Sequence, residues 1–207
     1  HDWTSSVRPR VVLLVLVLLV SPAEAQQPVP PPSAAPAEDG QWTMPAKNYA
    51  GTRFSGLDEI TAANVGQLQV AFSFSPGVNR GQESAPIVVG TTMYLVTPYP
   101  NVVYALDLER SGALKWQHNP RPDAAAQGVA CCDVVNRGPT YDDGKIFLTT
   151  LDAHVVALDA ETGRELWNTR LGDINKGETM TMAPLVARGK VYVGISGGEY
   201  GVRGWLQ

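Results

Sequence analysis

The 207-residue chain has 44% hydrophobic and 17% charged residues, the composition of an ordinary globular protein. Its net charge of −4 gives no basis for binding nucleic acid or an anionic membrane surface, so neither is expected as a partner. The 20 glycines and 16 prolines favour turn-rich β structure over a helical bundle.

The first 25 residues have the three parts of a secretory signal peptide. Arg8 and Arg10 precede an apolar run at residues 11–20, and Ser-Pro-Ala-Glu-Ala at 21–25 provides an A-x-A cleavage site. The apolar run is about half as long as a membrane-spanning helix. We therefore predict a cleaved signal peptide and a periplasmic mature chain, with an uncleaved anchor as the alternative.

Residues 26–40 are rich in Pro, Ala and Ser and almost lack large apolar side chains. Such a segment cannot bury enough surface to offset the entropy of ordering it. We predict a disordered leader here and a folded domain over residues 41–207.

A repeat in the folded part indicates the fold class. Residues 102–116 form an alternating apolar strand, an Asp, a Gly-containing turn and a second strand with a Trp, and residues 155–167 repeat this pattern. This is a β-hairpin in which the Asp accepts hydrogen bonds from turn amides and the Gly supplies a positive φ. The matching residues are Asp107 and Asp159, Gly112 and Gly163, and Trp116 and Trp167.

Each hairpin is preceded by another two-strand unit, at residues 86–96 and 139–148, and a third such unit lies at 184–194. Four short antiparallel strands per period predict an all-β propeller with about two and a half blades in this chain. The third blade breaks off at 204–207, where its third strand should begin. Phe72 and Phe74 are interpreted as part of an outer strand of a preceding blade. A β-sandwich is the alternative fold.

The two cysteines, Cys131 and Cys132, are adjacent. Neighbouring Cα atoms lie about 3.8 Å apart, below the usual separation for a disulfide, so a bond between them would close a tight ring. An oxidising compartment permits such a bond. A reduced buried pair or a redox pair is equally compatible with the dipeptide.

Four strings, at residues 42–49, 81–86, 130–138 and 196–204, resemble in this order the PQQ-dependent alcohol dehydrogenases of the methanol/ethanol type. The strongest of them reads Ala-Cys-Cys-Asp-Val-Val-Asn-Arg-Gly. That family is an eight-bladed propeller with pyrroloquinoline quinone (PQQ) on its axis. The resemblance implies that Cys131 and Cys132 form a disulfide that makes one wall of the cofactor slot.

The resemblance also implies roles for individual residues. PQQ is a flat tricarboxylate, and the residues implied to bind it are Glu83, Cys131, Cys132, Arg137, Thr181, Ser196, Gly197 and Gly198. Glu199 matches a ligand of the bound cation, calcium or a lanthanide, which requires several oxygen ligands. Without the resemblance, Arg137 would suit a surface salt bridge, Glu83 a solvated loop and residues 196–199 a glycine-rich turn.

The function implied is oxidation of a small primary alcohol, with electrons passing to cytochrome c. A second copy of the chain or a small subunit is a further expected partner. The family's catalytic base, second metal ligand and stacking tryptophan would lie beyond Gln207, so the 207 residues alone are expected to be inactive. His1, His118 and His154 lack metal-ligand spacing, and the sequence has no C-x-x-C-H haem motif. A non-catalytic propeller scaffold that binds proteins and a truncated, inactive product are the alternatives.

Overall fold

The computed structural model describes residues 40–131 and 133–207. The predicted signal peptide and all but the last residue of the predicted leader lie outside the described residues. None of the helices in the described part is long and apolar enough to cross a membrane.

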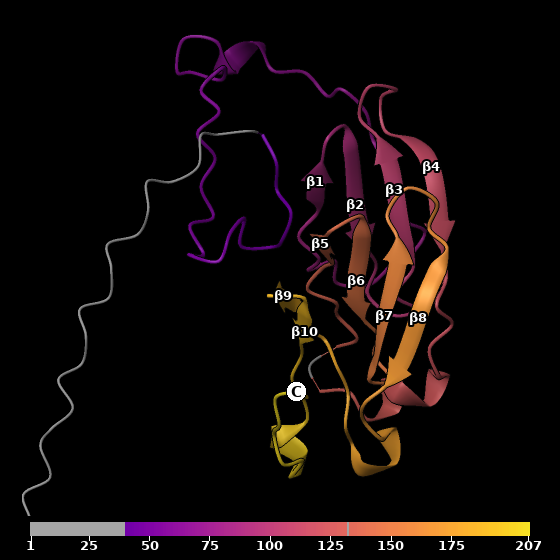
Figure 1. Cartoon of the computed structure of the whole chain (residues 1–207). Coiled ribbons are helices and arrows are strands. Elements are labelled where there is room, and N and C mark those ends of the chain that lie inside the picture. The colour runs from indigo at the N-terminus through magenta and orange to yellow at the C-terminus, as the bar shows by residue number, and fades with distance from the viewer. Residues whose placement is uncertain (1–39, 132) are drawn as a thin grey trace, which may run out of the picture. The chain divides into compact units, whose positions relative to one another are not determined.

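Two four-stranded antiparallel sheets form most of the fold (Figure 1). The first has the order β1 (Ile87–Val89), β2 (Thr92–Val96), β3 (Val103–Asp107) and β4 (Ala113–His118). The second has the order β5 (Thr140–Asp142), β6 (Lys145–Thr149), β7 (His154–Asp159) and β8 (Glu165–Arg170). Both sheets follow the order of the sequence, so each predicted period is one up-and-down blade.

A third unit begins in the same way with β9 (Leu185–Ala187) and β10 (Lys190–Tyr192). Beyond it, Leu206 forms an antiparallel bridge with Gly194, and Val193 and Gln207 exchange two backbone hydrogen bonds of 2.9 and 3.0 Å. Residues 204–207 thus start the third strand, as predicted. Four 3₁₀ helices complete the elements of the described part: η1 (Val65–Gln67), η2 (Ala124–Gly128), η3 (Ile174–Lys176) and η4 (Gly198–Tyr200).

The Asp–Gly turn predicted for each blade is present in both complete blades. Asp107 Oδ1 accepts hydrogen bonds from the Glu109 and Arg110 amides, at 3.0 and 3.3 Å. Asp159 Oδ1 accepts from the Thr162 amide at 2.8 Å. The turn glycines that follow both have a φ of +72°. The same hydrogen bonds hold both carboxyl pKa values below their usual range, led by the Arg110 guanidinium at Asp107 and the Thr162 hydroxyl at Asp159.

Trp116 joins the first blade to the second. Its indole lies against the turn of the second blade, where a Cβ placed on Gly163 would be 2.5 Å from the ring. Its Nε1 donates to the Ala160 carbonyl at 3.0 Å, and the Tyr94 hydroxyl donates to the same oxygen at 3.0 Å. Trp116 is thus a contact between the two blades. Trp167 packs on Phe147 in its own blade and remains 39% exposed.

Residues 68–74 have no strand structure and pair with none of the described strands, so the outer strand expected there, which belongs to another blade, stays a prediction. The packing expected of such a strand is nevertheless present. A Cβ on Gly112 would lie 2.4 Å from the Phe72 ring, so Phe72 covers the turn of the first blade as Trp116 covers that of the second. Phe74 packs edge-on against Tyr104, with ring centroids 5.0 Å apart.

The first strands of the three units are neighbours. β5 contacts both β1 and β9, and these strands follow one another in Figure 1. The Thr140 hydroxyl donates to the Pro184 carbonyl at 2.6 Å, which ties β5 to the residue before β9. Successive sheets that meet along their first strands are blades arranged around an axis, so β1, β5 and β9 are the innermost strands. The segments that enter these strands therefore lie close together.

Candidate functional site

The candidate site lies where the chain enters the innermost strands. Glu83, Arg137 and Thr181 each precede one of these strands, β1, β5 and β9 in turn. Residues that are far apart in the sequence thus occupy equivalent places in successive blades. The blade repeat is therefore what brings them together.

A continuous line of polar contacts joins these three residues to a fourth. Arg137 Nη2 lies 3.5 Å from Glu83 Oε2, and Arg137 Nη1 donates to the Thr181 hydroxyl at 2.7 Å. Thr181 Oγ1 in turn lies 3.4 Å from Ser196 Oγ. The Arg137 backbone amide also donates to the Thr181 carbonyl at 3.0 Å, which fixes the spacing between the two segments.

The guanidinium at the centre of this line is accessible. The Arg137 and Glu83 side chains are 55% and 50% exposed, whereas Thr181 is buried. The arginine therefore offers donor groups to a ligand while Thr181 and Glu83 hold it in place. A planar guanidinium fixed in this way suits a carboxylate or a quinone oxygen.

The glycine-rich string at 196–199 adds a backbone approach beside the hydroxyls. Ser196 pairs with Thr179 in an isolated antiparallel bridge, and its amide donates to the Thr179 carbonyl at 2.8 Å. Gly197 has a φ of +108°, and a Cβ there would lie 2.6 Å from the Gly177 carbonyl oxygen, so no other residue fits. Gly198 and Glu199 follow in η4 and are exposed.

The cysteine segment, residues 123–131 and 133–136, has its far part beside the residues that lead to β1. Cys131 is half-buried, and Cys132 lies outside the described residues, so the bond between them stays a prediction. Beyond the pair, Asp133 Oδ1 lies 3.9 Å from Arg80 Nη1, on the segment that leads to Glu83. The structure thus brings the end of the cysteine segment next to the residues that precede β1.

Two site residues were not assigned a role from the sequence. Asn136 is fully buried; its Nδ2 donates to the Thr149 carbonyl at 2.9 Å, and its Oδ1 accepts from the Gly138 amide at 2.9 Å. It therefore fixes the backbone on either side of Arg137. Thr179 is buried beside Ser196, and its hydroxyl has no hydrogen-bond partner in the described part of the chain. In the sequence, a role for Thr179 was indicated only by its position two residues before Thr181.

The expected cation ligand is less well supported by its surroundings. No group of three His, Cys, Asp or Glu side chains that could hold a metal ion occurs among residues 40–131 and 133–207. Glu199 alone could supply one carboxylate. A complete cation site would need oxygen ligands from the cofactor or from elsewhere.

Blades that meet along their first strands define a propeller, and its inner end carries an arginine, two hydroxyls and a glycine-rich turn, groups whose chemistry suits an anion. Residues 42–166 match the family model of the PQQ-containing glucose/ethanol/alcohol dehydrogenases, beta-propeller domain. The chain belongs to this PQQ-dependent dehydrogenase family.

Curated relatives support the same family. A lanthanide-dependent methanol dehydrogenase of Methylacidiphilum fumariolicum (strain SolV) is 58% identical over 168 residues, which cover 81% of this chain and 28% of the relative. Subunit 1 of a cytochrome c methanol dehydrogenase of Methylobacterium organophilum is 48% identical over 174 residues, covering 81% of this chain and 28% of that protein.

Solved structures agree in fold. A europium-containing methanol dehydrogenase matches with a TM-score of 0.78 and 57% identity, over 80% of this chain and 29% of that one. A quinohemoprotein alcohol dehydrogenase of Comamonas testosteroni matches with a TM-score of 0.76 and 40% identity, over 82% of this chain and 25% of that one. The chain thus spans less than a third of the length of these relatives.

Proposed function

We propose that this chain is the N-terminal part of a periplasmic quinoprotein that oxidises small primary alcohols of the methanol/ethanol type. The observation that carries the proposal is the contact line from Glu83 through Arg137 and Thr181 to Ser196 at the entrance to the innermost strands. Family membership and the names of the relatives support the same chemistry.

The residues of the line fit PQQ. Arg137 would donate to a carboxylate or a quinone oxygen, and its contact with Glu83 keeps its guanidinium oriented when the cofactor leaves. Thr181 and Ser196 would add hydroxyl donors. The backbone at Gly197 and Gly198 would allow a flat anion to approach closely. Cys131 and Cys132, if bonded, would supply a rigid wall on one face.

The bound cofactor would supply the hydride acceptor for alcohol oxidation, and a bound cation would supply Lewis-acid activation of it. Glu199 would contribute one ligand to that cation. Calcium and a lanthanide both prefer oxygen ligands, and the names of the lanthanide-dependent and europium-containing relatives favour a lanthanide.

The electrons would pass to a cytochrome c, which the names of several relatives give as the acceptor. A second copy of the chain or a small subunit stays a predicted partner. Because the chain spans less than a third of the length of these relatives, we expect the 207 residues alone neither to retain PQQ nor to oxidise alcohol.

The test uses the full-length dehydrogenase to which we propose that this chain belongs. Arg137→Lys keeps the charge but loses the planar fork, so PQQ affinity measured by absorbance titration should fall about tenfold or more. The matched control is Arg110→Lys, which alters an exposed arginine paired with a turn aspartate, at 2.8 Å. It should leave affinity unchanged.

Alcohol-dependent reduction of cytochrome c should fall with PQQ occupancy in the Arg137 variant. A wild-type protein that binds no PQQ and reduces no acceptor would contradict the proposed function and would favour a non-catalytic scaffold. Equal PQQ affinities for Arg137→Lys and Arg110→Lys would contradict the role of Arg137.

A further inference from the structure

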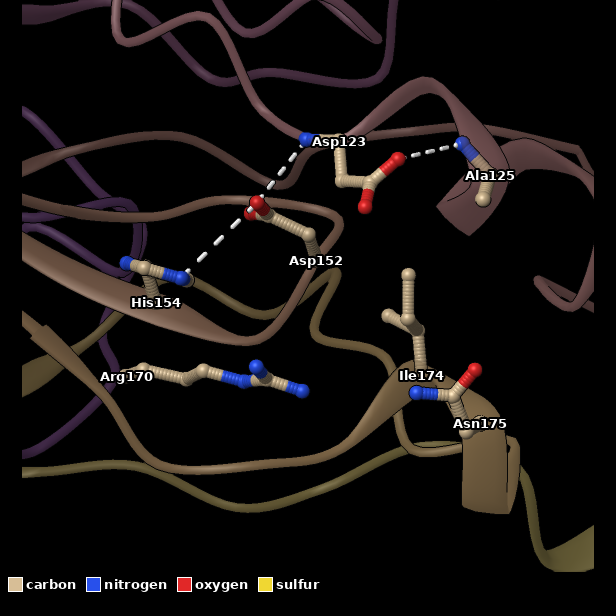
Figure 2. Close-up of a pocket in the computed structure, with 7 residues that line it drawn as sticks. All are labelled: Asp123, Ala125, Asp152, His154, Arg170, Ile174 and Asn175. Atoms are coloured by element: carbon tan, nitrogen blue, oxygen red, sulfur yellow. Dashed lines mark hydrogen bonds and ion pairs between the residues drawn. The ribbon is translucent and has the colours of Figure 1, made fainter.

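A backbone hydrogen bond at Asp123 ties the start of the cysteine segment to a neighbouring turn. η2 leads from Asp123 towards Cys131, and Asp123 caps η2 by accepting a hydrogen bond from the Ala125 amide at 2.9 Å. The Asp123 amide donates to Asp152 Oδ2 at 2.9 Å (Figure 2). Asp152 lies in the second blade, in the turn between β6 and β7. One carboxylate therefore connects that turn to the start of the cysteine segment.

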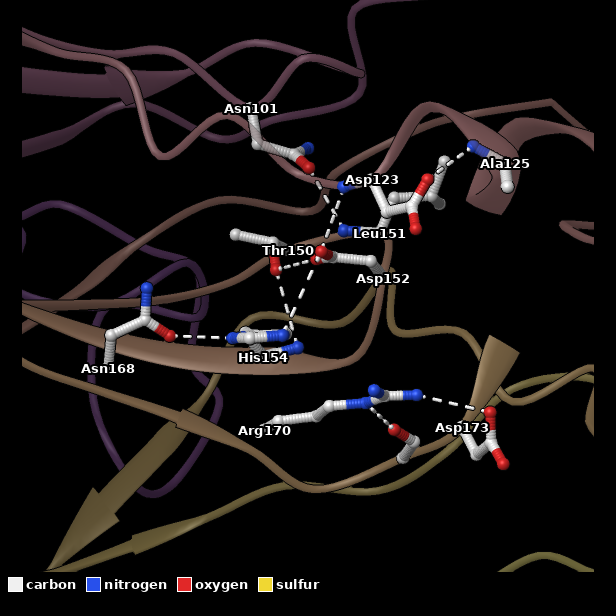
Figure 3. Close-up of polar contacts among 11 residues, drawn as sticks. Asn101, Asp123, Ala125, Thr150, Leu151, Asp152, His154, Asn168, Arg170 and Asp173 are labelled. Atoms are coloured by element: carbon white, nitrogen blue, oxygen red, sulfur yellow. Dashed lines mark hydrogen bonds and ion pairs between the residues drawn. The ribbon is translucent and has the colours of Figure 1, made fainter. Parts of the chain in front are cut away.

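Asp152 is itself held on several sides. Its Oδ1 accepts a hydrogen bond from the Thr150 hydroxyl, and its Oδ2 lies 3.8 Å from His154 Nε2 (Figure 3). Its side chain is only 13% exposed. His154 is oriented in turn by Asn168, whose Oδ1 lies 2.7 Å from His154 Nδ1. The Asp152 carboxylate is thus held by Thr150 and His154 in addition to its contact with the Asp123 amide.

The turn that carries Asp152 is anchored to the first blade. The Leu151 amide donates to Oδ1 of the fully buried Asn101 at 2.9 Å. Leu151 also packs in an apolar cluster with Ala126 of η2 and Val134 from beyond the cysteines. The same turn region therefore supports the segment on both sides of Cys131, and at its far end the Thr149 carbonyl accepts from Asn136.

The apolar cluster and the hydrogen bond to Asp152 restrict the position of the cysteine segment in different ways. The apolar cluster brings the segment onto the turn but allows it to slide, because such contacts are not directional. A hydrogen bond to a charged acceptor is directional and about twice as strong as one between neutral groups. Asp152 is the charged acceptor at the start of the segment.

We propose that Asp152 is a positioning residue: it fixes the start of η2 and through it the place of the cysteine segment in the site. This role does not require Asp152 to touch the cofactor. Its consequence for PQQ binding rests on the proposed function above.

The test compares Asp152→Ala, Asp152→Asn and Asp143→Ala in the full-length protein. Asp143 is the matched control, an aspartate in the turn between β5 and β6 that is 89% exposed and forms an ion pair with Lys145. Hydrogen exchange should report on the Ala126, Val129 and Ala130 amides, which bond within η2 and just after it. Asp152→Ala should exchange about tenfold faster at these amides, whereas Asp143→Ala should not, since a bond to a charged group contributes about that much.

Asp152→Asn should give an intermediate rate of exchange, because a neutral oxygen accepts a weaker hydrogen bond than a carboxylate. Its remaining oxygen can accept from the Asp123 amide while its nitrogen donates to Thr150 Oγ1. PQQ affinity, from absorbance titration of the apoprotein, should follow the same order of variants, with the melting temperature of the whole protein little changed. A purely structural residue would instead lower the melting temperature without a local change in exchange.

Unchanged exchange at the η2 amides in Asp152→Ala would overturn the proposal. Faster exchange with wild-type PQQ affinity would also overturn it, because the segment would then move without consequence for the site. Absence of PQQ binding in the wild-type protein would refute the proposed function instead, and the exchange result would still decide whether Asp152 fixes the segment.

Discussion

At the scale of single residues, Gly163 and Gly144 allow two free-energy costs of an added side chain to be compared. One is the cost of a left-handed backbone conformation, and the other is the cost of a steric clash. Gly163 and Gly144 have φ values of +72° and +74°. A Cβ on Gly163 would overlap the Trp116 ring at 2.5 Å, whereas one on Gly144 would meet nothing within 4 Å. Gly144→Ala should cost about 1 kcal/mol from the left-handed conformation alone.

Gly163→Ala should cost about 2 kcal/mol more than Gly144→Ala, since it adds overpacking to the same strain. Urea unfolding of both variants measures the difference. Equal losses would show that the Trp116 ring moves aside freely and that this contact does not join the blades.

His118 predicts a pH dependence of stability. Burial lowers the pKa of its ring below 6.5, and the Glu165 carboxylate, 3.5 Å from Nε2, opposes this only partly. Because the unfolded chain then binds the proton more readily, stability is highest above pH 6.5 and falls as pH drops from there through the folded pKa.

His118→Gln should flatten this fall, and Glu165→Gln should enlarge it by removing the opposing charge. Melting temperatures at a series of pH values between about 7.5 and 5 check both expectations. A wild-type stability that rises as pH falls through this range would contradict the sign.

The sequence indicates which residues could serve the site but not which of them contact one another. Arg137 and Glu83 could be paired only through a family resemblance, because their contact depends on how two blades meet. Asn136 and Asp152 carried no signal of their own, since a buried amide or carboxylate is recognised by its partners and not by spacing along the chain.

At the scale of elements, Ala160 couples the first two blades through one carbonyl. Tyr94 Oη and Trp116 Nε1 both donate to it at 3.0 Å. Tyr94→Phe or Trp116→Phe alone leaves the carbonyl with one partner, so the hydrogen-bond loss in each should be about 1 kcal/mol. The double variant leaves a buried carbonyl unsatisfied and should lose about 1 kcal/mol more than the sum.

Urea unfolding of the four proteins in this cycle measures the coupling. Strict additivity would show that the two donors act independently and that the carbonyl finds another partner, such as water.

The strands themselves followed from alternation and turn chemistry. Asp107 and Asp159, with Gly112 and Gly163 later in the same turns, mark hairpins that the structure contains at the expected places. Residues 68–74 have a similar apolar pattern but pair with no strand in the described part of the chain, and β structure requires a partner. Strand pairing depends on the whole fold, so the sequence of residues 68–74 alone could not show whether they form a strand.

At the scale of the whole molecule, the repeat explains the site. Each blade brings the residues before its innermost strand to the same end, so Glu83, Arg137 and Thr181 gather from three blades, and Ser196, which follows β10, joins them through its bridge to Thr179. Repetition made the blades predictable from sequence. The convergence of Glu83, Arg137 and Thr181 was not predictable from periodicity, because it depends on how the blades are arranged around the axis.

A crystal structure of the full-length protein with PQQ bound would test the central claim most directly. We predict quinone density in contact with the Arg137 guanidinium and the Thr181 hydroxyl, and beside Cys131. Density elsewhere, for example on the outer strands near Trp167, or crystals soaked with PQQ that show none, would contradict the account.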